Sequence, residues 1–251
     1  MPRNNWTRDQ LIVAFNLYCR TPFGRIHNRN PEIISLAKAI GRTPSALSWK
    51  LANFARLDPT ITGRNLLGAT HGAKLEQEIW DEFNSDWDRL AFESEKLRSQ
   101  YLKTEAELKI PADFPEGRNR LASVMVRVNQ NFFRAAVLAA YDSQCCITGL
   151  GLSDLLCASH IIPWREDPKN RTNPRNGLCL NAIHDRAFDR GLIAINPDLR
   201  VEVSPTIRKM KSESLDKLIF SYEGSPLKLP KHFQPDPEFL AHHHRTVFRR
   251  A

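Results

Sequence analysis

Apolar side chains recur at helical spacing through the first hundred residues of the chain. The pattern predicts helices over residues 7–19, 31–40 and 44–55, each beginning at or just after a Thr or Asn that can cap a helix. A longer helical pattern covers residues 74–108 and is interrupted at residues 84–85. The first part of the chain is therefore expected to form a helical domain.

A different pattern begins after residue 110. Residues 110–117 include two prolines and a glycine, which mark a boundary between domains of residues 1–110 and 111–251. Further on, residues 155–162 are almost all apolar, and Pro163 follows them. This run predicts a buried strand that ends at the proline.

The segment after that strand predicts the rest of the second domain. A loop rich in Pro and Asn leads to a short strand or turn, and then to a helix over residues 182–189 that Asn181 can cap. Residues 192–203 indicate a hairpin with an Asn-Pro-Asp turn, and residues 129–141 a helix. We therefore predict an α+β fold, with a mainly helical first domain and a small second domain of strands and a helix.

The second and third helices are separated by a short turn at Gly41, an arrangement similar to a helix-turn-helix motif. In that interpretation the third helix directs polar side chains toward the major groove of DNA. The residues expected to face outward are Ser45, Ser48, Trp49, Lys50 and Asn53. The alternative is a corner of a helical bundle whose polar residues face only solvent.

The distribution of charge favours a polyanionic partner. The 251 residues carry a formal net charge of +8, and residues 1–60 contain nine Lys or Arg against three acidic residues. Such a basic region is typical of a protein that binds nucleic acid. A soluble basic protein with scattered lysines is the alternative explanation.

Cysteine content and hydropathy indicate where the protein works. The five cysteines are odd in number and lack the spacing of a disulfide framework, which suits a reducing cytoplasm. No apolar run reaches the roughly 18 residues of a membrane span, and the start of the chain is polar rather than a secretory signal. We expect a cytoplasmic protein that does not enter a membrane.

Side chains with catalytic chemistry gather in residues 155–193. His160 stands near the end of the predicted strand, Asn176 lies in the following loop, and His184 lies on the helix. Taken singly, a buried histidine can be a core group, and Asn-Gly simply forms turns. The ordered segments CITG, SHIIPW, PRNGLCLN and HDRAFDRG are more specific than any one of these residues.

These segments resemble the HNH (ββα-metal) endonuclease family, and most specifically a subgroup similar to restriction endonucleases. The similarity covers roughly residues 117–251. It implies a ββα-metal domain that hydrolyses phosphodiester bonds of double-stranded DNA. It also implies one divalent ion per site, Mg²⁺ or Mn²⁺, which stabilises the phosphate and the leaving oxygen.

The resemblance also implies roles for individual residues. His160 is the general base, and His184 occupies the metal-binding position of the helix. Asn176 orients His160 or binds the ion through its amide oxygen. Many members have Asp or His directly before the base, where this chain has Ser159. The secondary candidates for the missing metal ligand are Asp185 and Asp189.

Arginines near the motif are candidates for contact with phosphate. Arg175 or Arg186 would neutralise charge in the transition state. Arg134, on the preceding helix, would touch the DNA backbone or tie that helix to the nuclease core. The CITG segment stands where many relatives begin a zinc-binding CxxC pair, but its second Cys is absent. We therefore expect no structural zinc.

The leading hypothesis is a metal-dependent endonuclease that cuts duplex DNA in restriction or phage defence. The alternative is a DNA-binding regulator whose HNH domain is a non-catalytic scaffold, and Ser159 keeps that alternative open. A third hypothesis is an effector nuclease gated by a signal molecule or a partner, although nothing in the chain resembles a small-molecule sensor domain. Because one HNH site cuts one strand, a symmetric homodimer would supply the second site.

Overall fold

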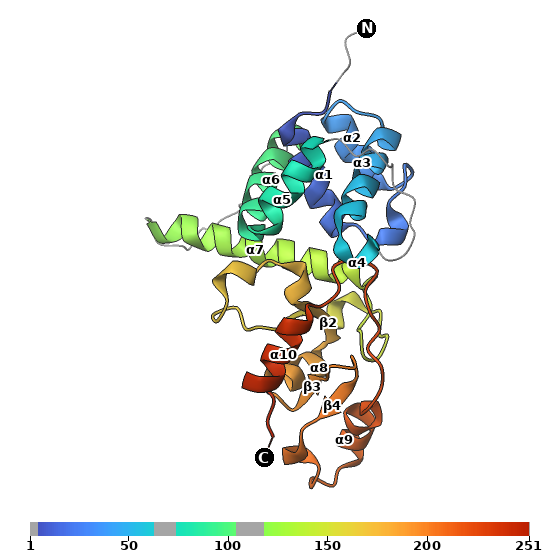
Figure 1. Cartoon of the computed structure of the whole chain (residues 1–251), viewed down its shortest axis with the longest axis vertical. Helices are drawn as coiled ribbons and strands as arrows, with labels where there is room; N and C mark the ends of the chain where they lie inside the picture. Colours follow the sequence, from blue (N-terminus) through green and yellow to red (C-terminus); the bar gives the residue numbers. More distant parts are fainter. Residues whose placement is uncertain (1–4, 63–73, 104–117, 251) are drawn as a thin grey trace. The chain divides into compact units, whose positions relative to one another are not determined.

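The computed structural model of the protein describes residues 5–62, 74–103 and 118–250 (Figure 1). The chain divides into two compact units, Met1–Ala136 and Val137–Ala251. The division falls within helix α7 (Arg118–Ala140), whereas the boundary predicted at residues 110–117 lies outside the described residues. Each unit has buried apolar side chains of its own.

Helices make up the first unit, and their starts follow from the residues that cap them. Thr7 forms a capping box, and the side chains of Asn30 and Thr43 accept hydrogen bonds from the first turns of the next two helices. The predicted helices are confirmed where the structure describes them, and residues 104–108 of the pattern predicted over residues 74–108 lie outside the described residues. Sequence patterns do not indicate α4 or the early start of α7. Before α7, the helices are α1 (Arg8–Arg20), α2 (Pro31–Ala39), α3 (Pro44–Leu57), α4 (Pro59–Thr62), α5 (Lys74–Asn84) and α6 (Trp87–Leu102).

Aromatic rings form the core of this unit around α1. The ring of Phe15 stacks on Phe54 of α3 with centroids 4.8 Å apart. It also lies 5.1 Å from the ring of Trp80 on α5 and 5.8 Å from that of Trp87 on α6. All four side chains are buried. Burial of these rings holds α3, α5 and α6 against α1.

The side of α3 that was expected to face outward is partly covered by α5. Asn53 is only 8% exposed, and its Nδ2 donates to both carboxylate oxygens of Glu76 at 3.1 Å. Lys50 pairs with the same buried carboxylate. The prediction that Asn53 points outward is therefore wrong, because α5 packs on that side. The open side of α3 carries Ser45 and Trp49, and Trp49 is 62% exposed.

The second unit is built around a two-stranded hairpin and the helix that follows it (Figure 1). Strand β1 (Leu156–His160) pairs antiparallel with β2 (Gly177–Asn181), so His160 lies opposite Gly177 and Leu156 lies opposite Asn181. Helix α8 (Ala182–Asp189) follows at once, because the Asn181 side chain accepts hydrogen bonds from the amides of its first turn. The predicted strand, loop and helix are confirmed.

The remaining elements complete this unit. The second predicted hairpin consists of β3 (Ile193–Ile195) and β4 (Val201–Val203), and helices α9 (Glu213–Leu218) and α10 (Pro237–Thr246) come after it. The fold is thus α+β, as predicted, with a helical region followed by small hairpins and a helix. Within the described segments, no helix has the length and apolar character needed to cross a membrane.

Candidate active site

His160 ends β1, and a backbone hydrogen bond fixes its imidazole. Nε2 lies 2.8 Å from the carbonyl oxygen of Arg171, which can only accept, so Nε2 donates its proton. The neutral ring then carries its lone pair on Nδ1. Burial lowers the pKa of His160, while the Arg171 carbonyl and the Asp185 carboxylate oppose this effect. At neutral pH the ring can therefore accept a proton at Nδ1.

The loop after β1 supports this hydrogen bond. The rings of His160 and Trp164 meet edge to face, with centroids 5.5 Å apart. The Arg171 guanidinium lies 5.4 Å from the centre of the same indole, and its Nε donates to the Trp164 carbonyl at 3.1 Å. Sequence reasoning missed Arg171, because its main-chain oxygen acts on His160 and no residue type signals such a role.

Asn176 joins the loop to the residues directly after His160. Its Oδ1 accepts from the amide of Ile162 at 2.8 Å, and its Nδ2 donates to the carbonyls of Ile162 at 3.2 Å and Asn170 at 3.1 Å. The side chain is only 1% exposed. Its amide thus holds the end of β1 through hydrogen bonds. The two roles predicted for Asn176, to orient His160 or to bind the ion, stay predictions.

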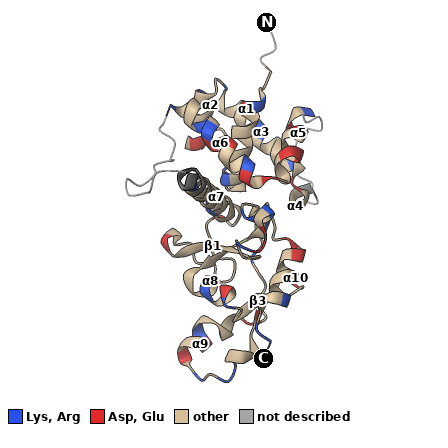
Figure 2. Ribbon diagram, turned by 90° about the vertical axis from the view of Figure 1, so that its left-hand side faces the viewer, with Lys and Arg blue, Asp and Glu red and all other residues tan. Residues whose placement is uncertain are grey.

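Two carboxylates lie on one face of α8. Asp185 and Asp189 are four residues apart, a spacing that places side chains one above the other on a helix. The charge of Asp185 acts on His160. Burial raises the pKa of Asp189, and repulsion from Asp185 adds to the effect, while Arg186 and Arg190 oppose it. Charges of both signs therefore mark α8 (Figure 2).

His184 has different surroundings from its neighbour Asp185. Its Nδ1 lies 3.0 Å from Oδ1 of Asn181, and its ring meets the ring of Tyr222 edge to face at 5.1 Å. The side chain is 2% exposed, burial lowers its pKa, and Nε2 has no hydrogen-bond partner within the described residues. The charge that reaches His160 from α8 is that of Asp185, whereas the ring of His184 contacts Asn181 and Tyr222.

Asp185 and Asp189 carry the kind of oxygen donor that a hard cation prefers. Among the residues described, no three His, Cys, Asp or Glu side chains converge to hold a metal ion. Mg²⁺, however, is usually held by one or two carboxylates together with waters and substrate phosphates. The repulsion between Asp185 and Asp189 is the kind that a bound cation relieves. Ser159 is 2% exposed, and its buried hydroxyl has no hydrogen-bond partner in the described part of the chain.

The arginines predicted to contact phosphate differ in whether an acidic residue already offsets their charge. Nη2 of Arg175 lies 3.1 Å from Oδ2 of Asp236, and its Nε donates to the Gln234 carbonyl. Arg175 therefore connects the loop before β2 to the start of α10, and the carboxylate of Asp236 offsets its charge. Arg134 and Arg186 are exposed.

The predicted contacts of α3 are likewise of two kinds. Ser45 is exposed, and its Oγ accepts from Nδ2 of Asn28 at 3.2 Å. The Ser48 hydroxyl donates to the Pro44 carbonyl at 2.9 Å. Ser45 is open to a partner, whereas Lys50 and Asn53 are held by Glu76.

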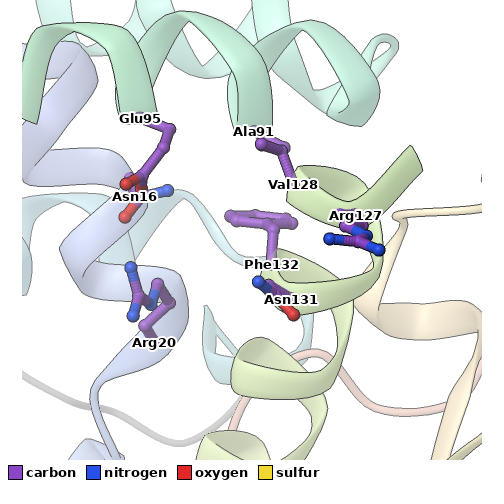
Figure 3. A pocket seen from close by; sticks show the side chains of 8 residues that line it. All are labelled: Asn16, Arg20, Ala91, Glu95, Arg127, Val128, Asn131 and Phe132. Carbon is purple, nitrogen blue, oxygen red and sulfur yellow. The ribbon is translucent and has the colours of Figure 1, made fainter. Parts of the chain in front are cut away.

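A polar notch lies elsewhere in the helical unit (Figure 3). Helices α1, α6 and α7 line it with two arginines, Arg20 and Arg127, and with Glu95. Its volume is about 30 Å³, which is room for about one water molecule. The notch is too small for a nucleotide, although its arginines add to the positive charge of this unit.

One family of known proteins is similar to the part of the chain that contains this site. Residues 145–196 match the model of a family described as HNH endonuclease. The match contains β1, β2 and α8, and with them His160, Asn176 and the two carboxylates. No curated protein matches the chain.

Proposed function

We propose that this protein cuts duplex DNA with His160 as the general base, because residues 145–196 match a family described as HNH endonuclease. One observation carries the proposal. The hydrogen bond from Nε2 to the Arg171 carbonyl puts the basic lone pair on Nδ1, at the end of a strand and within the influence of Asp185. A neutral, oriented imidazole is what proton abstraction from water requires.

The other residues of the site hold the base and the cation in place. Nδ1 of His160 accepts the proton of the attacking water, and Asn176 keeps the end of β1 in position through its three hydrogen bonds. Asp185 and Asp189 would hold a divalent cation, Mg²⁺ or Mn²⁺. Such an ion supplies Lewis-acid stabilisation of the phosphate and of the departing oxygen. Arg186 is exposed on the same helix and would offset phosphate charge.

The helical unit is proposed to bind DNA through the open side of α3. Ser45 and the exposed Trp49 lie on that side, and Lys50 is withdrawn into its pair with Glu76. An exposed tryptophan beside a serine offers both apolar contact and hydrogen bonding to DNA. A role in restriction or phage defence rests on the similarity of the four motifs to restriction endonucleases.

A second candidate function is a DNA-binding regulator without catalysis. The observation that favours it is Ser159, which is buried where many HNH proteins have a metal ligand. This candidate predicts salt-sensitive binding to DNA without strand scission. The two candidate functions can be distinguished by one product, because only the nuclease produces a nicked DNA strand.

The test compares His160→Gln with the unmodified protein on supercoiled plasmid in Mg²⁺ and in Mn²⁺. The Gln side-chain amide can still donate a hydrogen bond to the Arg171 carbonyl, so the end of β1 should keep its conformation. Glutamine cannot act as a general base, because its amide does not accept a proton at neutral pH. Nicking is expected to fall by at least about 100-fold, within the range that general bases contribute, with an unchanged melting temperature. Normal nicking by the variant would disprove the mechanism, and an inactive unmodified protein that still binds DNA would favour the regulator.

A further inference from the structure

A pocket of about 540 Å³ opens beside the first turn of α8, and nothing in the catalytic proposal uses it. Apolar side chains from three parts of the second unit line it. They include Leu150, Leu155, Ile183 and Leu218. Leu155 is 47% exposed, Ile183 49% and Leu218 43%. Large apolar groups left open to water around a hollow are typical of a binding site.

The wall of this pocket holds one buried polar group, the imidazole of His184. Asn181 Oδ1 already accepts from two backbone amides of α8, so the His184 Nδ1 at 3.0 Å donates to it. The lone pair is therefore on Nε2, which is buried and has no partner within the described residues. A buried acceptor without a donor is costly, and a ligand that brings an N–H or O–H would remove that cost.

Aromatic and basic groups complete the pocket. Tyr222 stands edge to face with His184, with centroids 5.1 Å apart, so the pocket can contact the face or edge of a planar ring. Gly149 lines the same pocket, and Nζ of Lys228 fills the space where a side chain at Gly149 would be. A cation thus lies next to an apolar hollow.

The pocket is separate from the catalytic base. Leu156 pairs with Asn181 at the end of the hairpin next to the pocket, whereas His160 pairs with Gly177 at the other end. Four residues of strand separate these ends, which corresponds to roughly 13 Å. Neighbouring parts of one nucleic-acid strand can span such a distance.

We propose that this pocket binds an unstacked nucleobase of the DNA substrate. A base has apolar faces for the leucines and Tyr222 and ring or amino N–H groups for Nε2 of His184, and its phosphate would meet Lys228. An acyl chain would fill the hollow, but it has no donor for Nε2 of His184. A free phosphate would lie against apolar side chains, which cannot form hydrogen bonds with it. Extrusion of a base costs a few kcal/mol, which contacts of this kind offset. This inference rests on the proposed function, because DNA supplies the base.

The experiment measures binding of adenosine, guanosine, cytidine and thymidine to the full chain by NMR line broadening, in EDTA, so that no metal ion takes part. We expect millimolar binding of at least one nucleoside. His184→Phe keeps a ring but removes the lone pair, and it should weaken that binding by at least about tenfold, as should Tyr222→Leu. Leu199→Ala is the matched control, because Leu199 lines a different pocket of the same unit. Melting temperatures confirm that each variant is folded.

The outcomes separate this inference from the proposed function. Nucleoside binding that depends on His184, in a protein that nicks no plasmid, would support the pocket and reject the nuclease. Plasmid nicking without nucleoside binding up to about 10 mM, a concentration about tenfold above the expected millimolar Kd, would reject the pocket alone. Equal binding by His184→Phe, or tighter binding of N-acetylphenylalanine amide, would show an apolar or peptide site instead.

Discussion

At the scale of single residues, α8 carries three of the candidates for a metal ligand that the resemblance suggests, namely His184 and the secondary candidates Asp185 and Asp189. The resemblance assigns the metal ion to His184, yet the charge that reaches His160 from α8 is that of Asp185. The ring of His184 instead contacts Asn181 and Tyr222. Neighbouring positions on a helix point in directions about 100° apart, so only one of the two can face a given partner.

Replacement of Asp185 should therefore impair cutting more than binding. Asp185→Asn would remove one of the two carboxylates that we propose hold the cation, and it should lower the rate of Mg²⁺-dependent nicking by at least about tenfold. DNA affinity, measured by fluorescence anisotropy in EDTA, should change little. Asp198→Asn, in the turn between β3 and β4, is the control and should cut normally. Full activity of Asp185→Asn would show that other residues bind the metal ion.

Asn176 gives a second prediction at this scale. Asn176→Ala leaves the amide of Ile162 and the carbonyls of Ile162 and Asn170 without their partner. Each buried group left unpaired costs about 1–3 kcal/mol, so the variant should lose about 3 kcal/mol of stability and much of its activity together. Asn170→Ala, a half-buried neighbour, should lose less. Urea denaturation and nicking assays are the measurements, and a stable but inactive Asn176→Ala would indicate a direct catalytic role.

At the scale of elements, His243 holds α10 against α8. Its ring stacks on Phe188 with centroids 3.7 Å apart, and its Nε2 donates to the Phe188 carbonyl at 3.1 Å. Burial lowers the pKa of His243 to about 4, and the neighbouring His244 and His242 add to the effect, while the hydrogen bond to Phe188 opposes it. The imidazole between these helices is therefore neutral at neutral pH, and its burial opposes protonation.

This contact predicts how stability depends on pH. The unfolded imidazole takes up a proton near its ordinary pKa of about 6.5, whereas the folded one does so only near pH 4. Acid therefore favours the unfolded state, and His243 should remove up to about 3 kcal/mol of stability as the pH falls from 6.5 to 4. Urea denaturation at pH 7, 5.5 and 4 measures this loss. His243→Leu should show a shallower dependence, and an equal slope in both proteins would contradict the assignment.

The two sides of α3 should respond differently to substitution. Glu76→Ala leaves Lys50 and Asn53 without their shared partner and should cost about 3 kcal/mol of stability. Trp49→Ala, on the open side, should change the melting temperature little and weaken DNA binding. Thermal melting and fluorescence anisotropy at a fixed salt concentration give the two readouts. Unchanged affinity in Trp49→Ala would place the DNA on another surface.

Local patterns in the sequence were enough to predict the elements, and long-range packing accounts for the rest. Caps such as Thr43 and Asn181 set where helices begin, and the apolar run before Pro163 forms β1. The direction of side chains on α3 depends on α5, because Asn53 donates a hydrogen bond to Glu76 of α5, which lies 23 positions away in the sequence. The tautomer of His160 depends on the main chain of Arg171. Neither contact can be predicted from the spacing of residues in the local sequence.

At the scale of the whole molecule, positive charge and a single nuclease motif determine how the protein would act on DNA. The net charge of +8 favours capture of a polyanion at a rate that falls with salt. The described part of one chain contains one ββα arrangement with His160 at its strand end. On the proposed function, one chain would hydrolyse one strand at each encounter, and a double-strand break would need a second copy.

The order of products from a supercoiled plasmid should reflect this stoichiometry. At low protein concentration, open circles should accumulate first and linear DNA should appear later, because the second cut requires another encounter. If two copies act together as a symmetric pair, linear DNA should form with a steeper than linear dependence on protein concentration. A gel time course at several concentrations measures both products, with His160→Gln as the inactive control. Linear DNA that forms from the start, in proportion to protein and without open circles, would show that one chain cuts both strands.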